Sequence, residues 1–167
     1  MKKLLLLLFA FTYAVSIPAQ DTVNSDVSTY FLIRHAEKVV SRDTDPALDQ
    51  WGVIRASQWA AIFSDIPFDA IYSTDYIRTI NTVKPTADIL GLEITLYDPG
   101  DINYIEFLEQ TRGKTVLIVG HSNTIPGFVN SLTGREKYEQ IEDNNNGNLY
   151  IVEISGNHIS DILLHIN

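Results

Sequence analysis

An arginine and a histidine, Arg34 and His35, stand side by side directly after the apolar run 31–33. Neither side chain helps a strand to bury itself, and two groups that can both be cationic repel each other. Two further apolar runs are followed by residues of the same kind: Arg78 comes shortly after one run, and His121 comes after the other. An adjacent Arg-His pair alone means little, but three such segments together predict one cationic pocket.

A pocket of this composition is suited to phosphate. Two arginine side chains and a helix N-terminus form a receptor for a tetrahedral dianion. Positive neighbours are expected to lower the pKa of His35, so that its neutral ring keeps one nitrogen free to attack phosphorus. His121 is expected to donate a hydrogen bond to the charge that builds on the phosphoryl oxygens. Polar side chains of the same segments are candidate substrate contacts, namely Thr79, Ser122 and Asn123.

The elements that must position these residues alternate between strand and helix. Short apolar, β-branched runs predict strands, and apolar residues at helical spacing predict helices. The expected strands are 29–33, 68–72, 93–97 and 115–119. One helix is expected to start at Asp49, which is its candidate N-cap, and three more helices are expected over 76–90, 101–111 and 124–132. A hairpin is expected from 149–154 and 159–166 around Gly156-Asn157. This order predicts a three-layer α/β fold: a mostly parallel sheet, helices on both faces and an antiparallel C-terminal hairpin. Ligands of such sheets bind beyond the carboxyl ends of the strands, where the cationic residues fall.

The N-terminal segment 1–19 has the layout of a secretory signal peptide. Lys2 and Lys3 precede an apolar run of 14 residues, and Ala19 is the expected cleavage site. The alternative is an uncleaved anchor, although the run is short for one. We therefore expect an exported protein, periplasmic or secreted, with a flexible leader over 20–28 and one domain over 29–167.

Composition limits the partners of the mature domain. Cleavage removes two lysines, so the net charge changes from −9 to −11. This charge disfavours nucleic acid and anionic membrane surfaces, and no stable membrane association is expected after cleavage. The chain has no cysteine, which excludes disulfides and thiolate catalysis. The expected partner is a small phosphorylated substrate or a phosphoprotein.

Three motifs occur in order along the domain: "LIRHAEK", "AIYSTDYIRTINTVKPTADIL" and "VLIVGHSNTIP". Together they resemble the histidine phosphatase superfamily, whose fold is phosphoglycerate mutase-like. The resemblance implies that His35 is the nucleophile, which would carry a phosphohistidine intermediate. It assigns Arg34 and Arg78 to phosphate binding and His121 to the second pocket histidine. It implies no metal and no organic cofactor.

The general acid is less well defined by the resemblance. The acid phosphatase branch has an aspartate after the second histidine, where this chain has Ser122, so that branch is disfavoured. The mutase branch places a glutamate after the second helix or third strand, where "YDPGD" offers Asp98 and Asp101. Asp101 ranks first because it follows a strand end and precedes a helix, and Glu37 is a further candidate. The helix at "PALDQWGVIRASQWA" also resembles a family segment, with Asp49 where threonine or serine is usual.

Other functions remain as alternatives. "GHSNT" nearly matches the nucleophile elbow of serine hydrolases, with Ser122 as nucleophile, but that function leaves both arginines and His35 unexplained. A non-catalytic phosphate-binding module has no use for an attacking histidine. A metal site is disfavoured because Arg34 and Arg78 repel cations. Phosphatase is favoured over mutase because the loops beside the pocket are short, and an open pocket lets water take the phosphoryl group.

Overall fold

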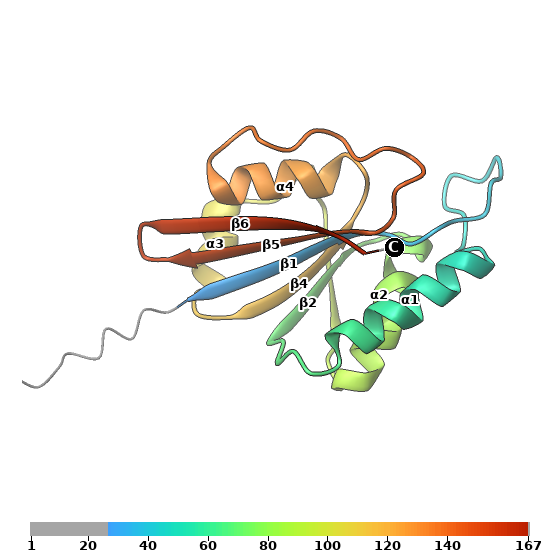
Figure 1. The fold of residues 1–167 in the computed structure, drawn as a ribbon, viewed down its shortest axis with the longest axis horizontal. Coiled ribbons are helices and arrows are strands. Elements are labelled where there is room, and N and C mark those ends of the chain that lie inside the picture. Colours follow the sequence, from blue (N-terminus) through green and yellow to red (C-terminus); the bar gives the residue numbers. More distant parts are fainter. Residues whose placement is uncertain (1–26, 167) are drawn as a thin grey trace, which may run out of the picture.

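The computed structural model describes residues 27–166 (Figure 1). The predicted signal peptide over 1–19, and all but the last two residues of the predicted leader, lie outside the described residues. In chain order the elements are β1 Ser28–Arg34, α1 Gln50–Phe63, β2 Ala70–Thr74, α2 Ile77–Leu90, β3 Ile94–Tyr97, α3 Tyr104–Gln110, β4 Thr115–Gly120, α4 Thr124–Thr133, β5 Asn148–Ser155 and β6 His158–His165. Every expected strand and helix is present, with ends that move by at most three residues.

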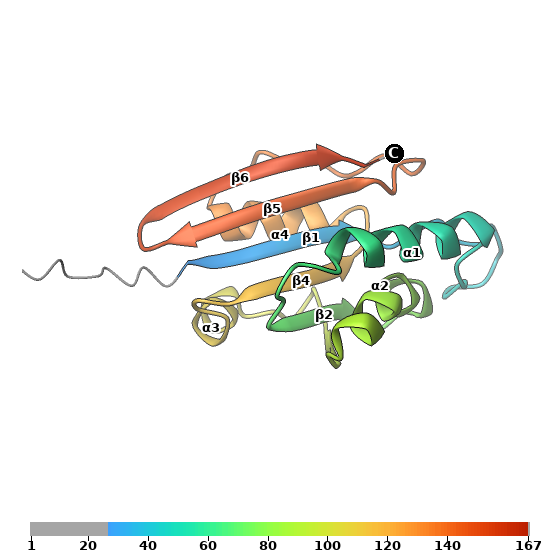
Figure 2. The same cartoon turned by 60° about the horizontal axis from the view of Figure 1, so that its bottom comes forward.

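The strands form one six-stranded mixed sheet in the order β3-β2-β4-β1-β5-β6 (Figure 2). The four strands from β3 to β1 are parallel, whereas β5 and β6 form an antiparallel hairpin. The hairpin turns at Gly156, whose φ of 58° lies in the left-handed region that favours glycine. The predicted fold class is therefore confirmed.

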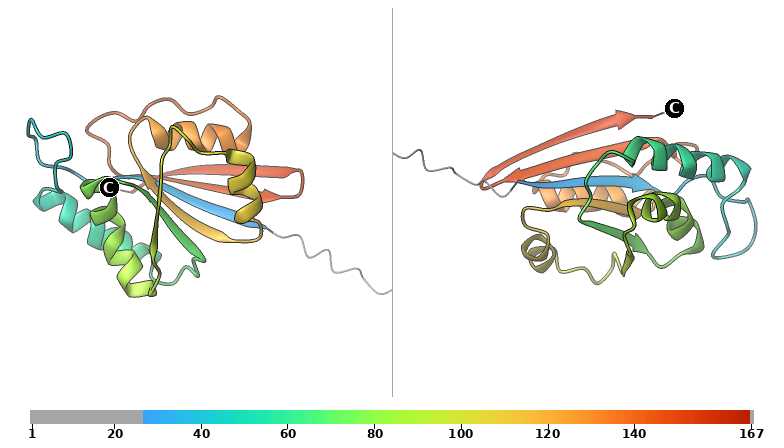
Figure 3. Two further views of the ribbon diagram at one scale, coloured as in Figure 1. Left: turned by 180° about the vertical axis from the view of Figure 1, so that it is seen from behind. Right: turned by 90° about the horizontal axis from the view of Figure 1, so that it is seen from below.

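Both faces of the sheet are covered by helices (Figures 1 and 3). Tyr30 and Leu32 of β1 pack in one core with residues of α3 and α4. Ile33 packs in a second core with residues of α1 and α2, because alternate side chains of a strand point to opposite faces. β4 alternates in the same way, which explains why both strands read as continuous apolar runs.

Local signals set the ends of the helices. The Asp49 carboxylate accepts a hydrogen bond from the Gly52 amide at 2.8 Å, so the expected N-cap of α1 is confirmed. Gly91 and Gly134 end α2 and α4 in the left-handed conformation, with φ values of 67° and 65°. By contrast, the N-cap residue of α2, Tyr76, makes no side-chain capping hydrogen bond.

The register of the parallel strands brings their carboxyl ends to one edge of the sheet. Arg34 pairs with Gly120 across β1 and β4, and the His35 amide donates to the Gly120 carbonyl at 2.9 Å. A side chain at Gly120 would meet the Thr124 hydroxyl at 2.8 Å, so only glycine fits there. No helix within residues 27–166 is long and apolar enough to cross a membrane.

Candidate active site

A cavity of about 840 Å³ opens at this edge of the sheet. Its lining comes from the ends of β1, β2, β3 and β4 and from the segments that follow them: Arg34, His35, Lys38, Thr74, Asp75, Tyr76, Arg78, Leu96, Tyr97, Asp98, Pro99, His121, Ser122, Asn123, Thr124 and Asp143. The four residues to which the sequence assigns the central roles are thus gathered in one cavity. The rings of His35 and His121 lie 5.5 Å apart, close enough for one phosphate to contact both.

His35 is positioned as a neutral nucleophile. Its ring is buried, and Nδ1 lies 2.7 Å from the Ala36 carbonyl oxygen. A carbonyl can only accept, so Nδ1 carries the proton and Nε2 keeps its lone pair. The pKa of His35 is lowered to about 3, mainly by burial and also by neighbouring Arg34, against the opposing effect of the Ala36 hydrogen bond. The expected direction is confirmed, but burial rather than positive charge is the main cause.

His121 is also neutral but is held differently from the sequence-based expectation. Its pKa is lowered to about 4, mainly by burial and also by Arg78, against the opposing effect of Asp45. Its Nδ1 lies 3.4 Å from Nη2 of Arg78, which can only donate, so Nε2 carries the proton. Nε2 lies 3.0 Å from the Thr74 hydroxyl and donates to it. Donation to a phosphoryl oxygen would therefore require this ring to exchange a partner.

The two arginines are fixed by different means. Nη1 of Arg34 donates to three main-chain carbonyls of the segment 142–145, at 2.9, 3.2 and 3.0 Å. Arg78 donates from Nη1 to Asp45 at 3.1 Å, and its guanidinium lies over the Tyr76 ring at 4.3 Å. Among the described residues, neither Arg34 Nε nor Arg78 Nε has a hydrogen-bond partner, although both are buried. Buried donors of this kind on two cavity-lining cations suit an anionic ligand.

The polar turn Asn144-Asn145-Asn146-Gly147 has a role that the sequence did not reveal. The Asn145 carbonyl accepts from Nη1 of Arg34, and the Asn146 side-chain amide donates to the His35 carbonyl at 2.9 Å. This turn lies more than 100 residues from the Arg-His pair in sequence. Only its asparagine and glycine content was visible, and that content predicts a turn without indicating what the turn contacts.

The structure places the three candidate acids in different surroundings. Asp101 is exposed and does not line the cavity, whereas Asp98 does. The Asp98 carboxylate accepts from the Gly100 amide at 2.8 Å, and this local turn separates the two aspartates. Both Glu37 oxygens accept from Nε of Arg55, and Glu37 lines a smaller neighbouring cavity instead. Asp75 and Asp143 also line the main cavity.

Of the three predicted substrate contacts, two line the cavity and one does not. Ser122 and Asn123 line the cavity. Thr79 is fully buried, and its hydroxyl donates to the carbonyls of Thr74 and Tyr76 at 2.8 and 2.9 Å. Thr79 therefore stabilises the turn into α2, and its predicted contact with substrate is not supported.

Comparison with known proteins supports the fold. The model of the histidine phosphatase superfamily (branch 1) matches residues 30–99. No curated protein sequence matched the chain. Solved structures that share the fold include three of different activities. The protein histidine phosphatase SixA complexed with tungstate has a TM-score of 0.64 and 14% identity, over 82% of this chain and 96% of that one.

The other two are enzymes of different classes. Phosphoglycerate mutase from Bacillus anthracis has a TM-score of 0.63 and 14% identity, over 84% of this chain and 93% of that one. A phosphoserine phosphatase mutant from Entamoeba histolytica, in complex with phosphoserine, has a TM-score of 0.60 and 20% identity, over 83% of this chain and 96% of that one. The family model thus matches less than half of the chain, and the solved structures show that the fold is shared.

Proposed function

We propose that this protein is a phosphatase that hydrolyses phosphomonoesters, or a phosphoprotein, through a phosphohistidine intermediate on His35. The observation that carries the proposal is the state of that ring: Nδ1 is bonded to the Ala36 carbonyl, so Nε2 is unprotonated in a cavity lined by Arg34 and Arg78. A neutral imidazole nitrogen beside two guanidinium groups is arranged to attack phosphorus.

The proposed reaction has two steps. In the first, the Nε2 lone pair forms a bond to phosphorus while the bond from phosphorus to the leaving oxygen breaks, and that oxygen takes a proton from a carboxyl group of the site. In the second, water attacks phosphorus and returns a proton to that carboxylate, the bond to Nε2 breaks, and inorganic phosphate leaves with the histidine restored. The arginines neutralise the equatorial oxygens in both steps.

Phosphatase is favoured over mutase by the shape of the site. The cavity is open, and the wall after β3 is the short segment that contains Asp98 and Pro99. A mutase must exclude water from its phosphohistidine, whereas an open cavity admits water to it. The predicted export would also separate the protein from cytoplasmic sugar phosphates. Solved structures with this fold include both classes, so the fold itself does not decide between them.

A serine hydrolase is disfavoured by the surroundings of Ser122. Such an enzyme needs a histidine that accepts the serine proton. Among residues 27–166, no hydrogen bond joins the Ser122 hydroxyl to a histidine, and His121 Nε2 is directed at Thr74. A passive phosphate-binding protein would not require the unprotonated Nε2 of His35 within the site.

Hydrolysis of a panel of phosphate monoesters by the purified protein tests the proposal. We expect release of inorganic phosphate from aryl phosphates, and from at least one alkyl phosphate or phosphoprotein, without transfer to a second acceptor. Carboxylate esters should not be cleaved. Net transfer of the phosphoryl group to an added phosphoglycerate would favour the mutase, and cleavage of carboxylate esters would favour the serine hydrolase.

The leaving-group dependence identifies the acid. Because Asp98 lines the cavity, we propose that it protonates the leaving oxygen. Asp98→Asn should slow alkyl phosphate hydrolysis by about 100-fold or more, because general acids contribute 10²–10⁴-fold. Hydrolysis of an aryl phosphate with a good leaving group should change little, since that group leaves without a proton. Asp101→Asn is the matched control and should leave both rates unchanged. Equal losses on both substrates in Asp98→Asn would exclude this role.

A further inference from the structure

The N-terminus of α2 is capped by a residue from a distant loop. Both oxygens of Asp45 accept from the Ile77 amide at 3.0 Å, and Oδ1 also accepts from Nη1 of Arg78 at 3.1 Å. Asp45 lies in the segment between β1 and α1, 33 residues before Arg78 in the chain. The capping group that Tyr76 does not supply is thus supplied by this carboxylate.

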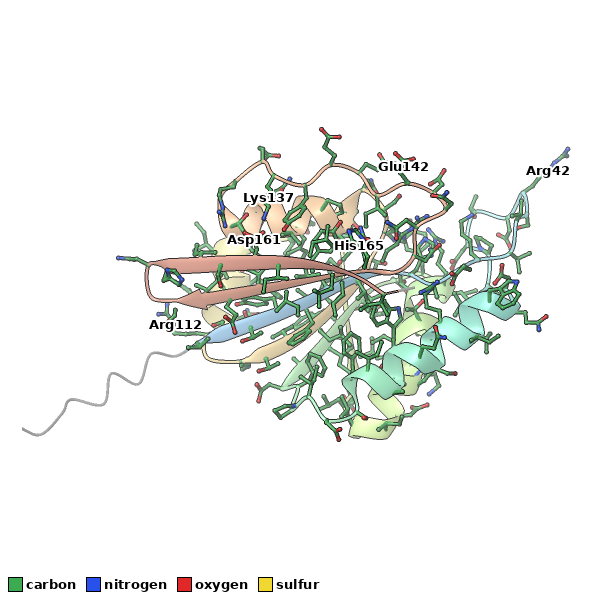
Figure 4. All side chains as sticks on the ribbon, in the orientation of Figure 1. Arg42, Arg112, Lys137, Glu142, Asp161 and His165 are labelled. Carbon is green, nitrogen blue, oxygen red and sulfur yellow. The ribbon has the colours of Figure 1, made fainter. Side chains whose placement is uncertain are left out.

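The loop that carries Asp45 is organised by its own contacts. An isolated antiparallel bridge joins Lys38 to Leu48, and the Val39 amide donates to the Ala47 carbonyl at 2.9 Å. At its outer part, where Arg42 marks the tip in Figure 4, the loop projects away from the sheet.

Two further features direct Asp45 back toward α2. Its amide donates to the Asp43 carboxylate at 3.1 Å, and the buried Pro46 restricts the residue before it to extended backbone. The carboxylate is therefore presented to α2 by a preorganised loop rather than by a chance surface contact.

Arg78 is held on three sides. Asp45 binds Nη1, His121 accepts from Nη2, and the Tyr76 ring lies beneath the guanidinium. Asp45 itself does not line the cavity, so it does not stand where a substrate phosphate would bind. We propose that Asp45 is a positioning residue, which fixes the guanidinium of Arg78 in the orientation that binds the transferring phosphoryl group. This inference rests on the proposed phosphatase function and concerns the same site.

The sign of the effect separates this role from a simple charge effect. A negative charge close to an anion site weakens anion binding. If Asp45 acted only in this way, removal of its charge should strengthen anion binding and leave the rate unchanged or raise it. A positioning residue acts in the opposite direction, because a displaced guanidinium no longer matches the phosphoryl oxygens. A residue that only stabilises the fold would lower the unfolding temperature without changing the rate per folded molecule.

The test is Asp45→Asn in the full-length protein, with kcat and KM for an aryl phosphate measured separately. Asparagine retains an oxygen for the Ile77 amide but loses the charge that orients Arg78. We expect kcat to fall by about 10- to 100-fold, the loss typical of a catalytic group misplaced by about 1 Å. Asp45→Glu, which keeps the charge, should recover part of this loss. Asp88→Asn is the matched control, because Asp88 forms an exposed ion pair with Lys84 on the same helix.

A double-mutant cycle with Arg78→Ala then shows whether Asp45 acts through Arg78. We expect the Asp45→Asn effect to vanish when Arg78 is absent. An unchanged or raised kcat in Asp45→Asn, or an equal loss with and without Arg78, would overturn the inference. If the wild-type protein hydrolyses no phosphate ester, the proposed function fails on its own. Calorimetric binding of inorganic phosphate then replaces kcat in the same cycle, and weaker binding in Asp45→Asn supports the positioning role while equal or tighter binding overturns it.

Discussion

His35→Ala is expected to abolish both turnover and the covalent intermediate. The Nε2 lone pair of His35 is the proposed attacking group, and the other histidine that lines the cavity, His121, is hydrogen-bonded to Thr74 and Arg78. Loss of a catalytic nucleophile removes all but a small fraction of the rate, so kcat/KM should fall by more than about 10⁴-fold. Measurement of kcat/KM with an aryl phosphate checks this, and an unchanged unfolding temperature shows that the variant is folded.

The intermediate has a chemical signature of its own. Wild-type protein that is quenched during turnover should carry one phosphate on a histidine. This adduct is a phosphoramidate, so it should be labile in acid and stable in base, the reverse of phosphoserine. His35→Ala should show no adduct, whereas Ser122→Ala should retain the adduct and substantial activity. Hydrolysis by His35→Ala at the wild-type rate would reject the phosphohistidine mechanism.

The sequence predicts that the four central residues lie together because each ends a strand, directly follows one or lies in the first turn of a helix. Arg34 ends β1, His35 and His121 follow strands, and Arg78 is the second residue of α2. In a parallel sheet these positions converge at one edge, so the strand pattern alone brings the four side chains together. The same pattern predicts the mixed sheet, because buried strands and a two-residue hairpin turn have clear sequence signatures.

The periphery of the site could not be predicted in this way, because it depends on irregular loops. Asp98 and Asp101 are three residues apart in one turn, and no periodicity specifies which side chain faces the cavity. In the structure Asp98 lines the cavity and its carboxylate accepts from the Gly100 amide, whereas Asp101 does not line the cavity. Asp45 and Asn146 contact the site across 32 or more positions of sequence. Their residue types suit loops in general, and only the folded chain shows what they bind.

Arg78→Ala is the second variant for which we expect a large loss. The Arg78 side chain is only 13% exposed, lies in the cavity and is oriented by Asp45 and His121. In such a site a charge-assisted contact to the transition state is not replaced by water. We expect kcat/KM to fall by about 10²–10³-fold, equivalent to roughly 3–4 kcal/mol of transition-state stabilisation. Steady-state kinetics with an aryl phosphate measure the loss.

Two further variants separate the shape of Arg78 from its charge. Arg112→Ala makes the same change in net charge at an exposed position far from the loop tip that Arg42 marks (Figure 4), and it should leave kcat/KM unchanged. Arg78→Lys keeps the charge but loses the planar fork that binds two phosphoryl oxygens, so it should recover only part of the loss. Full recovery in Arg78→Lys would mean that charge alone is required. The contacts of Asp45 and His121 with separate guanidinium nitrogens would then have no catalytic consequence, because an ammonium group acts as a point charge without the fixed donor directions of the guanidinium.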